Sequence, residues 1–472
     1  MLPKPKNYAI WPSVILADTP TEMTIIPTER AFLFFEDQEY TLTFIPVNSD
    51  ESYYKPFNRT VLTVKATNGV LRFQYTFAGE QEHLILLTQG ERKLGEVVVY
   101  SLYEDLYKLT PLKGDLHSHS YRSDGRRDPV ALAGHYREQG YDFFALTDHN
   151  RYYPGQEIVD GYKDVKLGIT ILPGEEVHTP GSVVHIVHVG GESSVTELYV
   201  KDIDGYKETI ANEYLEKVPP EIPEGFKERY AAATWATEHI HQVGGLAIFP
   251  HPFWRPGASR AFNVCDAYSN ILLKSGMFDA YELIGGMKWE GNNRSVALWS
   301  DLRANGLKVP VVGSSDVHAT EKAEDFPYLY TICFAENNDN TSIVKAVKEM
   351  NTVAVESTGY EYNYQYRCHS NSLRLVSYAH FLLHYYFPLR QRICQGEGVA
   401  MRAYAMGEAS AALIELQVEL SKSFSNRFFG KEPPVLPSAE ILDFESRWRQ
   451  RQLEGPLTKG STVYAPPISR QL

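Results

Sequence analysis

Two histidines two residues apart, followed by a carboxylate, are the first candidate metal ligands in this sequence. His117 and His119 lie in the segment 114–120, and Asp124 follows in Ser123-Asp124-Gly125. Residues two apart on a β-strand point to the same face, so both imidazoles can face one ion. Imidazole and carboxylate together suit zinc, manganese or iron better than calcium or magnesium. A surface loop with two histidines is the alternative, and the rest of the chain decides between them.

More imidazoles and carboxylates follow the apolar runs that read as buried strands. In α/β folds, ligands and catalytic groups gather at the carboxyl ends of such strands. Nine positions qualify, which is more than one four-coordinate metal needs. The set therefore favours two or three metals bridged by carboxylates. The candidates are His117, His119, Asp124, His149, Glu176, His185 or His188, His251, Asp316 and His318.

The elements that position these residues alternate between strand and helix. Asp128-Pro129 predicts a helix start, with Asp as N-cap and Pro in the first turn, and Gly140 predicts its end. An apolar strand follows at 141–146 and runs into Thr147-Asp148-His149. The pattern recurs about seven times between 113 and 359, which predicts a closed (β/α) barrel. The polar insertion at 192–229 is predicted to be a lid or a surface excursion.

The two flanks have a different character. Short alternating strands between 20 and 110, with Asn68-Gly69 as a hairpin signal, predict a β-sandwich domain over 1–110 without candidate catalytic residues. The barrel is predicted over 111–360. The tail, 361–472, is predicted to be a helical extension, with helices near 371–395 and 400–427 and weak order after Gly430.

Composition narrows the function classes. The chain has 472 residues, 43% of them hydrophobic and 22% charged, as in a soluble globular protein. A net charge of -13 argues against a nucleic-acid partner, whereas a small phosphorylated substrate needs only local positive charge. The four cysteines are too widely spaced for a thiolate zinc site or a disulfide scaffold. No segment reads as a signal peptide or a membrane span, so we expect a cytoplasmic protein with no membrane partner.

In their order along the chain, these motifs resemble those of the polymerase-and-histidinol-phosphatase (PHP) family, over about 113 to 359. The resemblance implies a distorted seven-stranded (β/α) barrel whose two- or three-metal centre, with manganese, zinc or iron, hydrolyses phosphoesters. It is nearest to stand-alone hydrolases with an N-terminal β-domain, some of whose relatives cleave carbamates or other non-phosphate esters. The matching motifs are Asp115-Leu116-His117-Ser118-His119, Ser123-Asp124-Gly125, Thr147-Asp148-His149, Gly174-Glu175-Glu176, Pro250-His251-Pro252 and Ser315-Asp316-Val317-His318.

The resemblance implies the same ligands by position. Glu176 matches better than Glu175, because the family's glutamate stands two residues after the glycine. His185 precedes Ile-Val as in the family, whereas His188 precedes Val-Gly-Gly, so His185 is favoured and His188 stays open.

The predicted function is that of a metal-dependent phosphoesterase in which a metal-activated water attacks the ester. His178 is either an acid or base or a structural residue, and Arg151 is either a phosphate contact or a solvated surface residue. Arg122, Arg126, Arg255 and Arg260 also flank the motifs, either as phosphate contacts or as solvated surface residues. One alternative keeps the metals but cleaves non-phosphate esters, carbamates or amides, and another is a non-catalytic binding module. A small, phosphorylated substrate and a homo-oligomer through the C-terminal helices are the expected partners.

Overall fold

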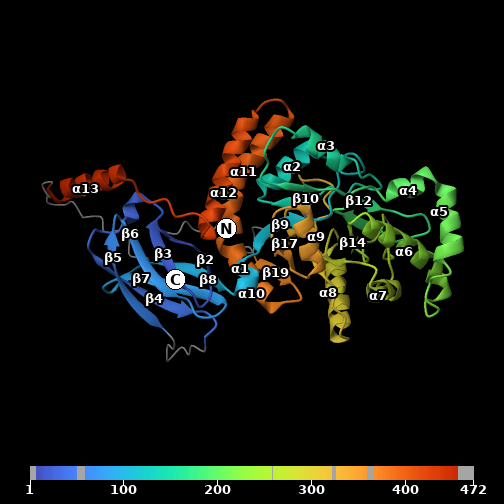
Figure 1. Ribbon diagram of the computed structural model, residues 1–472, viewed down its shortest axis with the longest axis horizontal. Coiled ribbons are helices and arrows are strands. Elements are labelled where there is room, and N and C mark those ends of the chain that lie inside the picture. The colour runs from blue at the N-terminus through green and yellow to red at the C-terminus, as the bar shows by residue number, and fades with distance from the viewer. Residues whose placement is uncertain (1–6, 50–58, 258, 322–325, 359–364, 455–472) are drawn as a thin grey trace.

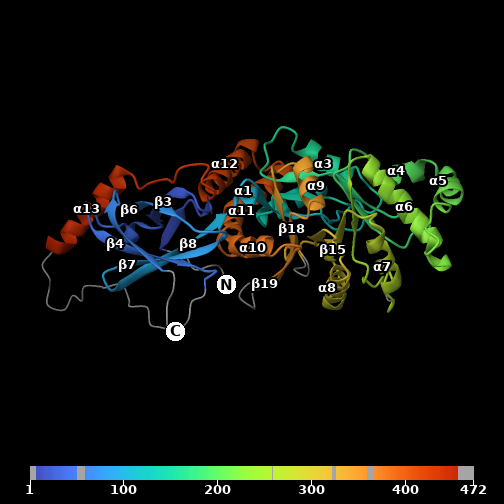
Figure 2. The same cartoon turned by 60° about the horizontal axis from the view of Figure 1, so that its bottom comes forward.

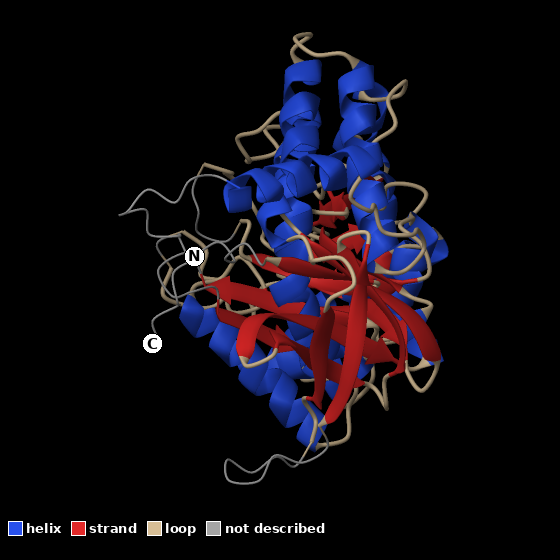
Figure 3. Ribbon diagram, turned by 90° about the vertical axis from the view of Figure 1, so that its left-hand side faces the viewer, coloured by secondary structure: helices blue, strands red, loops and turns tan. Residues whose placement is uncertain are grey.

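The structure, a computed structural model, describes residues 7–49, 59–257, 259–321, 326–358 and 365–454. A β-rich part and an α/β part lie side by side, with C-terminal helices between them (Figure 1). In a view from the β-rich end, the strands lie together beneath two long helices that project beyond them (Figure 3). In the described ranges, none of the helices is both long and apolar enough to cross a membrane.

The β-rich part is one eight-stranded sheet in the order β1-β3-β6-β5-β4-β7-β8-β2. Asn68 and Gly69 both have positive φ, 53° and 72°, which confirms the predicted hairpin turn between β5 and β6. β5 pairs first with β4 and then, at its end, with β6, so the ladder is continuous and the predicted β-sandwich is not confirmed in its exact form. The strands are β1 (Tyr8–Trp11), β2 (Val14–Leu16), β3 (Pro20–Pro27), β4 (Glu39–Pro46), β5 (Thr60–Thr67), β6 (Val70–Thr76), β7 (Gln81–Gln89) and β8 (Arg92–Leu102).

The α/β part has two hydrogen-bonded sheets, in the orders β11-β10-β9-β17-β18-β19 and β12-β13-β14-β15-β16. Isolated parallel bridges join them, Ser118 to Val317 and His149 to Glu176. The strands are β9 (Thr110–Asp115), β10 (Phe143–Ala145), β11 (Thr170–Leu172), β12 (Gly174–Val177), β13 (Ile186–Val189), β14 (Leu246–Phe249), β15 (Ala280–Ile284), β16 (Val311–Gly313), β17 (Leu329–Ala335), β18 (Thr352–Thr358) and β19 (Gln365–His369).

The predicted mixed α/β architecture with curled strands is confirmed, but the exact closed (β/α)7 barrel is not. β13 runs antiparallel to β12 and β14, and β17 runs antiparallel to β9 and β18. The connection between β12 and β13 is too short for a crossover helix, so these strands can pair only as a hairpin. Apolar side chains of both sheets meet in one core that includes Leu116, Phe143, Leu172, Val187, Ile248 and Val312.

Helices cover the outside of these two sheets (Figure 1). The predicted helix start at Asp128-Pro129 is confirmed, since Asp128 Oδ1 accepts a hydrogen bond from Ala131 N at 3.0 Å. The insertion after β13 contains α4 and α5. The helices are α2 (Pro129–Glu138), α3 (Pro154–Gly161), α4 (Thr196–Lys201), α5 (Ile203–Thr209), α6 (Lys227–Gln242), α7 (Asp266–Ser275), α8 (Trp289–Ala304) and α9 (Asn340–Lys348).

The C-terminal helices connect the two parts. They are α10 (Leu373–Tyr385), α11 (Phe387–Ala405), α12 (Ala411–Phe428) and α13 (Ala439–Glu454), and the short α1 (Glu104–Tyr107) follows β8. The tail is helical as expected, but α11 runs through the gap predicted between 395 and 400. Residues 439–454 of the segment predicted to be weakly ordered form α13, which lies along the β-rich part (Figure 2). Residues 455–472 lie outside the described residues, and the predicted domain boundaries stay predictions.

On one side the connecting helices pack against aromatic rings of the β-rich part. The Trp11 ring lies 6.0 Å from that of Phe424, and the Tyr100 ring 5.1 Å from that of Tyr378. On the other side α11 packs closely against α2. A Cβ on Gly398 would lie 2.3 Å from Glu138 N, so this approach requires glycine.

A buried ion pair fixes α2 to α11. Arg137 Nε lies 2.6 Å from Glu397 Oε2, and the two side chains are 1% and 0% exposed. Gly168 N also donates to Glu397 Oε1 at 2.7 Å. Neither charge reaches water, so Glu397 depends on Arg137 for compensation, while Arg137 Nη1 also lies 3.7 Å from Asp142 Oδ1.

Replacing Arg137 should therefore destabilise the protein. Arg137→Met leaves Glu397 buried without its cation, and we expect the free energy of unfolding to fall by about 3–5 kcal/mol. Lys166→Met is the control, because Lys166 and Glu419 form an exposed pair in which removal should cost about 1 kcal/mol or less. Urea unfolding followed by circular dichroism measures both. Equal losses in the two variants would contradict a structural role for the buried pair.

Candidate metal centre

The sequence motifs meet at one end of the α/β part, just beyond their strands. The segments that carry His117, His149, His251 and Asp316 follow β9, β10, β14 and β16, and Glu176 lies within β12. Strand direction therefore brings together side chains that are up to about two hundred residues apart in the sequence.

Four overlapping groups of side chains could each hold an ion, with ligand atoms within 4.8 Å of one another. His117, His119, His149 and Glu176 each take part in two of these groups. Shared ligands are what neighbouring ions in one centre require. The groups are His119, Asp124, His149 and His318; His117, Glu176 and His251; His117, His119 and Asp316; and His149, Glu176 and His178.

Glu176 lies at the middle of the cluster. Its Oε2 is 2.7 Å from His149 Nδ1 and 3.4 Å from His117 Nε2. Its Oε1 is 2.8 Å from His185 Nδ1 and 3.2 Å from His251 Nε2. The two oxygens thus face different histidines, which is the arrangement of a carboxylate that can bridge two ions.

Two aspartates extend the cluster in the direction of solvent. Asp316 Oδ1 lies 2.9 Å from His119 Nε2. Asp124 lies 3.3 Å from His318 Nε2 and 3.5 Å from His149 Nε2. The side chain of Asp124 is 54% exposed, whereas those of His119 and Glu176 are fully buried, so the cluster opens on the Asp124 side.

The residues fit bound cations. Glu176 Oε2 and Asp316 Oδ1 are buried and, within the described residues, have no hydrogen-bond partner despite the nearby nitrogens. An unsatisfied buried oxygen is costly, and a metal ion is one way to satisfy it. His251 and Asp316 also adopt positive φ angles of 25° and 51°. Such backbone strain in non-glycine residues concentrates at functional sites.

The electrostatics of the cluster keep its carboxylates ionised. Burial raises the pKa of Glu176, but the neighbouring imidazoles, His117 first, outweigh it and hold that pKa well below its usual range. Burial lowers the pKa of His149, yet Asp124 and Glu176 together raise it to about 10. The ionised carboxylate is the form that binds a cation.

Two further aspartates hold the motif loops in place. Asp115 accepts hydrogen bonds from His117 N at 3.2 Å and from Ser315 N at 3.0 Å, which ties the first motif to the last. Asp148 accepts from Ser120 N at 2.8 Å and from Ser123 Oγ at 2.6 Å. The hydrogen bonds of these two carboxylates therefore hold the motif loops together.

Sequence reasoning missed Glu282. This side chain is fully buried in the middle of β15, and its Oε2 lies 2.9 Å from His117 Nδ1. A carboxylate on one imidazole nitrogen directs the other nitrogen at the metal. The available signal was a lone charge in the apolar strand Ala280-Tyr281-Glu282-Leu283-Ile284.

The structure separates the two alternative histidines. His185 lies beside Glu176, whereas His188 is buried beside Glu175, with 3.3 Å between His188 Nδ1 and Glu175 Oε1. Glu175 and Glu176 are adjacent in β12, so they face opposite sides of the strand. This placement favours His185, and its role as a ligand stays a prediction.

The other candidate catalytic residues differ in position. His178 Nε2 lies 3.1 Å from His149 Nδ1, within the cluster. Arg151 is exposed, and its guanidinium contacts Tyr153 Oη at 3.3 Å, so its role as a phosphate contact stays a prediction. Arg151 follows Asn150, whose positive φ of 53° changes the chain direction directly after the motif.

No protein-family model matches the chain. A curated relative, DNA polymerase/3'-5' exonuclease PolX of Bacillus subtilis (strain 168), is 39% identical over 83 residues, 16% of this chain. The chain thus spans 15% of the length of that relative.

Three solved structures are similar in part. A two-domain protein containing a predicted PHP-like metal-dependent phosphoesterase from Bacteroides vulgatus is 19% identical, with a TM-score of 0.36, over 52% of this chain and 65% of that one, just under two thirds. A putative metal-dependent phosphoesterase from Bifidobacterium adolescentis is 17% identical, with a TM-score of 0.32, over 44% of this chain and 89% of that one. An amidohydrolase from Chromobacterium violaceum is 20% identical, with a TM-score of 0.30, over 45% of this chain and 89% of that one.

The PHP family that the motifs resemble is thus named again among these similar structures, one of which is described as PHP-like. The residues of this chain themselves indicate a metal centre, because every predicted ligand position lies in one cluster.

Metal content tests the shared ligands. Because the four ligand groups overlap, we expect purified protein to carry two or three transition-metal ions per chain. Elemental analysis of protein prepared without chelators gives the number. One ion or none in active protein would contradict a multinuclear centre.

A second prediction concerns Asp316. Asp316→Asn keeps the size of the side chain but removes a buried charge that lies 2.9 Å from His119. Since replacing the outer partners of a metal ligand already costs about 10–100-fold in affinity or activity, loss of Asp316 should cost at least as much, with the fold retained.

The matched control is Asp279→Asn. Asp279 lies at the amino end of β15, whereas the metal centre lies beyond the carboxyl ends of the strands, and its carboxylate is 2.9 Å from His241 Nε2. This variant should therefore lose stability but keep its metal. Metal occupancy, turnover and melting temperature are measured for both. Full occupancy and turnover in Asp316→Asn would remove Asp316 from the centre.

Proposed function

We propose that the protein is a metal-dependent hydrolase, and most directly a phosphoesterase. The observation that carries this proposal is Glu176, whose two oxygens face different histidines inside a cluster with further buried ligands. Manganese, zinc or iron would suit this set of imidazoles and carboxylates. Bound ions would lower the pKa of a water molecule and neutralise charge that develops on the substrate.

The open side of the cluster is where a substrate would enter. The side chains of His149, His178 and His318 are 27%, 28% and 38% exposed, whereas His117 is fully buried. The buried ligands therefore hold the centre, and the open ones border the space for the ester.

His178 is our candidate for moving a proton. It lies 3.1 Å from His149 and 3.6 Å from Glu176 Oε1, on the open side. Its backbone N–H donates to Asn150 Oδ1 at 2.9 Å, which fixes its position next to the motif. From there its imidazole can reach the leaving group of a bound ester as an acid.

One observation favours a second candidate, the hydrolysis of non-phosphate esters, carbamates or amides. The arginines that were candidates for phosphate contact are mostly engaged elsewhere. Arg122 pairs with Glu157, Arg126 with Glu321, and Arg255 with Glu290, at 2.6, 3.2 and 3.0 Å. A paired arginine is less available to a phosphate, so this class of substrate belongs in the test. The complete ligand set argues against a purely non-catalytic binding module.

The remaining proposals concern partners. We propose that the substrate is a small molecule and that the protein binds neither nucleic acid nor a membrane. We also propose a cytoplasmic location. A homo-oligomer through the C-terminal helices is supported by Leu413, Leu416 and Leu420, which are exposed along one side of α12.

Turnover on a panel of substrates tests the proposed function. We expect metal-loaded protein to hydrolyse phosphomonoesters or phosphodiesters, and chelation to reduce the rate by about 100-fold or more. Aryl esters, carbamates and amides form the second arm of the panel. The Asp279→Asn variant serves as a folded control with an intact centre. Activity confined to the second arm would replace the phosphoesterase proposal, and no metal-dependent activity in either arm would contradict both.

A further inference from the structure

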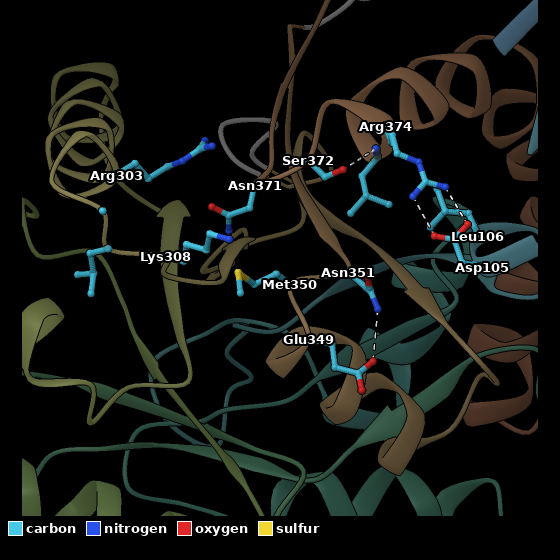
Figure 4. Close-up of a pocket in the computed structure, with 13 residues that line it drawn as sticks. Asp105, Leu106, Arg303, Lys308, Glu349, Met350, Asn351, Asn371, Ser372 and Arg374 are labelled. Carbon is cyan, nitrogen blue, oxygen red and sulfur yellow. Dashed lines mark hydrogen bonds and ion pairs between the residues drawn. The ribbon is translucent and has the colours of Figure 1, made fainter. Parts of the chain in front are cut away.

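A cavity of about 380 Å³ lies at the junction between the β-rich part and the α/β part (Figure 4). Its walls come from α1, from the loops that precede β16 and β18, and from the start of α10. Because these loops lie at the amino ends of β16 and β18, the cavity is at the end of the strands opposite to Asp316, which follows β16. The cavity is therefore distinct from the metal centre.

Two cations in the wall have no carboxylate partner among the described residues. Arg303 lies over the Trp299 ring at 4.6 Å, and its Nη1 donates to Ser370 O at 3.4 Å. Lys308 forms no ion pair within the described part of the chain. In Figure 4 both side chains extend toward Asn371 from the same side of the cavity. The two positive charges thus lie on one side of the cavity, and neither forms an ion pair with a described carboxylate.

The acidic residues of the cavity are held by other groups. Asp105 forms an ion pair of 2.8 Å with Arg374, which also binds Glu80 at 2.6 Å. Glu349 lies 4.0 Å from Lys345 and accepts from Asn351 at 3.4 Å. Neither carboxylate forms an ion pair with Arg303 or Lys308 among the described residues.

The rest of the lining gives the site an apolar side. Leu106 and Leu375 are buried side chains of the lining, and Met350 lies between Lys308 and Asp105. A cavity of this volume is within the range of small-molecule sites. Its occupant would combine an anionic group with a short carbon body.

We propose that this cavity binds a small organic anion, with its phosphate or carboxylate group between Arg303 and Lys308. Charge-assisted hydrogen bonds from guanidinium and ammonium groups are suited to both kinds of oxyanion. Binding here does not depend on the proposed hydrolase activity.

Isothermal titration of the full-length, metal-loaded protein tests the proposal. The probes are inorganic phosphate, glycerol 3-phosphate and butyrate, which distinguish a phosphate site from a carboxylate site and from a preference for an organic body. Arg303→Met and Lys308→Met should each weaken binding by about tenfold, the value of one lost charge-assisted hydrogen bond. Glu349→Gln removes a nearby negative charge and should strengthen binding. Both cations are exposed, and the melting temperature of each ligand-free variant reports its folding.

Two controls separate this site from others. Asp316→Asn reports any anion bound at the metal centre, and the signal of the cavity should remain in that variant. Lys201→Met removes an exposed cation on α4 and should leave binding unchanged. Affinities unaltered in Arg303→Met, Lys308→Met and Glu349→Gln would overturn the proposal, as would a signal lost only in Asp316→Asn or the absence of binding for all three probes.

Discussion

Compensation of the buried carboxylates of Glu176 and Asp316 is the constraint on which the rest of the site depends. Each lies in a fully or largely buried position, and each is within 3.5 Å of imidazole nitrogens from other segments of the chain. A buried charge without partners would shift its pKa and become neutral. The histidines therefore have two roles. They keep the carboxylates ionised, and together with them they form the groups that could hold metal ions.

That arrangement explains several features that lie further out. Asp115 and Asp148 fix the motif loops through backbone and hydroxyl donors, and burial raises the pKa of Asp115 to about 6 although those donors oppose the rise. Glu282 holds His117 from the interior. Outside the sheets, the buried pair of Arg137 and Glu397 fixes α2 to α11. Contacts outside the cluster thus hold the residues of the cluster in position, as a preorganised site requires.

Local signals were sufficient for much of this structure. Asp128-Pro129 and Asn68-Gly69 encode their cap and turn within a few residues, and both were predicted correctly. Most of the candidate ligands could be brought together from the sequence because they follow apolar strands, and strand ends converge in α/β folds. The hairpin of β12 and β13 and the division into two sheets depend on long-range pairing, which periodicity does not contain. Glu282 was missed for a similar reason, since only the fold reveals that it faces His117. The contact of Arg151 with Tyr153 could not be predicted either, because proximity in sequence to His149 does not determine where a long side chain points.

The central claim is that Glu176 bridges ions in a centre that the predicted ligands share. Crystals of the metal-loaded protein, measured by anomalous diffraction at the absorption edge of the bound metal, test it most directly. Our account predicts at least two separate anomalous peaks, with the two oxygens of Glu176 coordinating different ions and Asp316 coordinating one of them. A single peak, or peaks that are not in contact with Glu176, would contradict it.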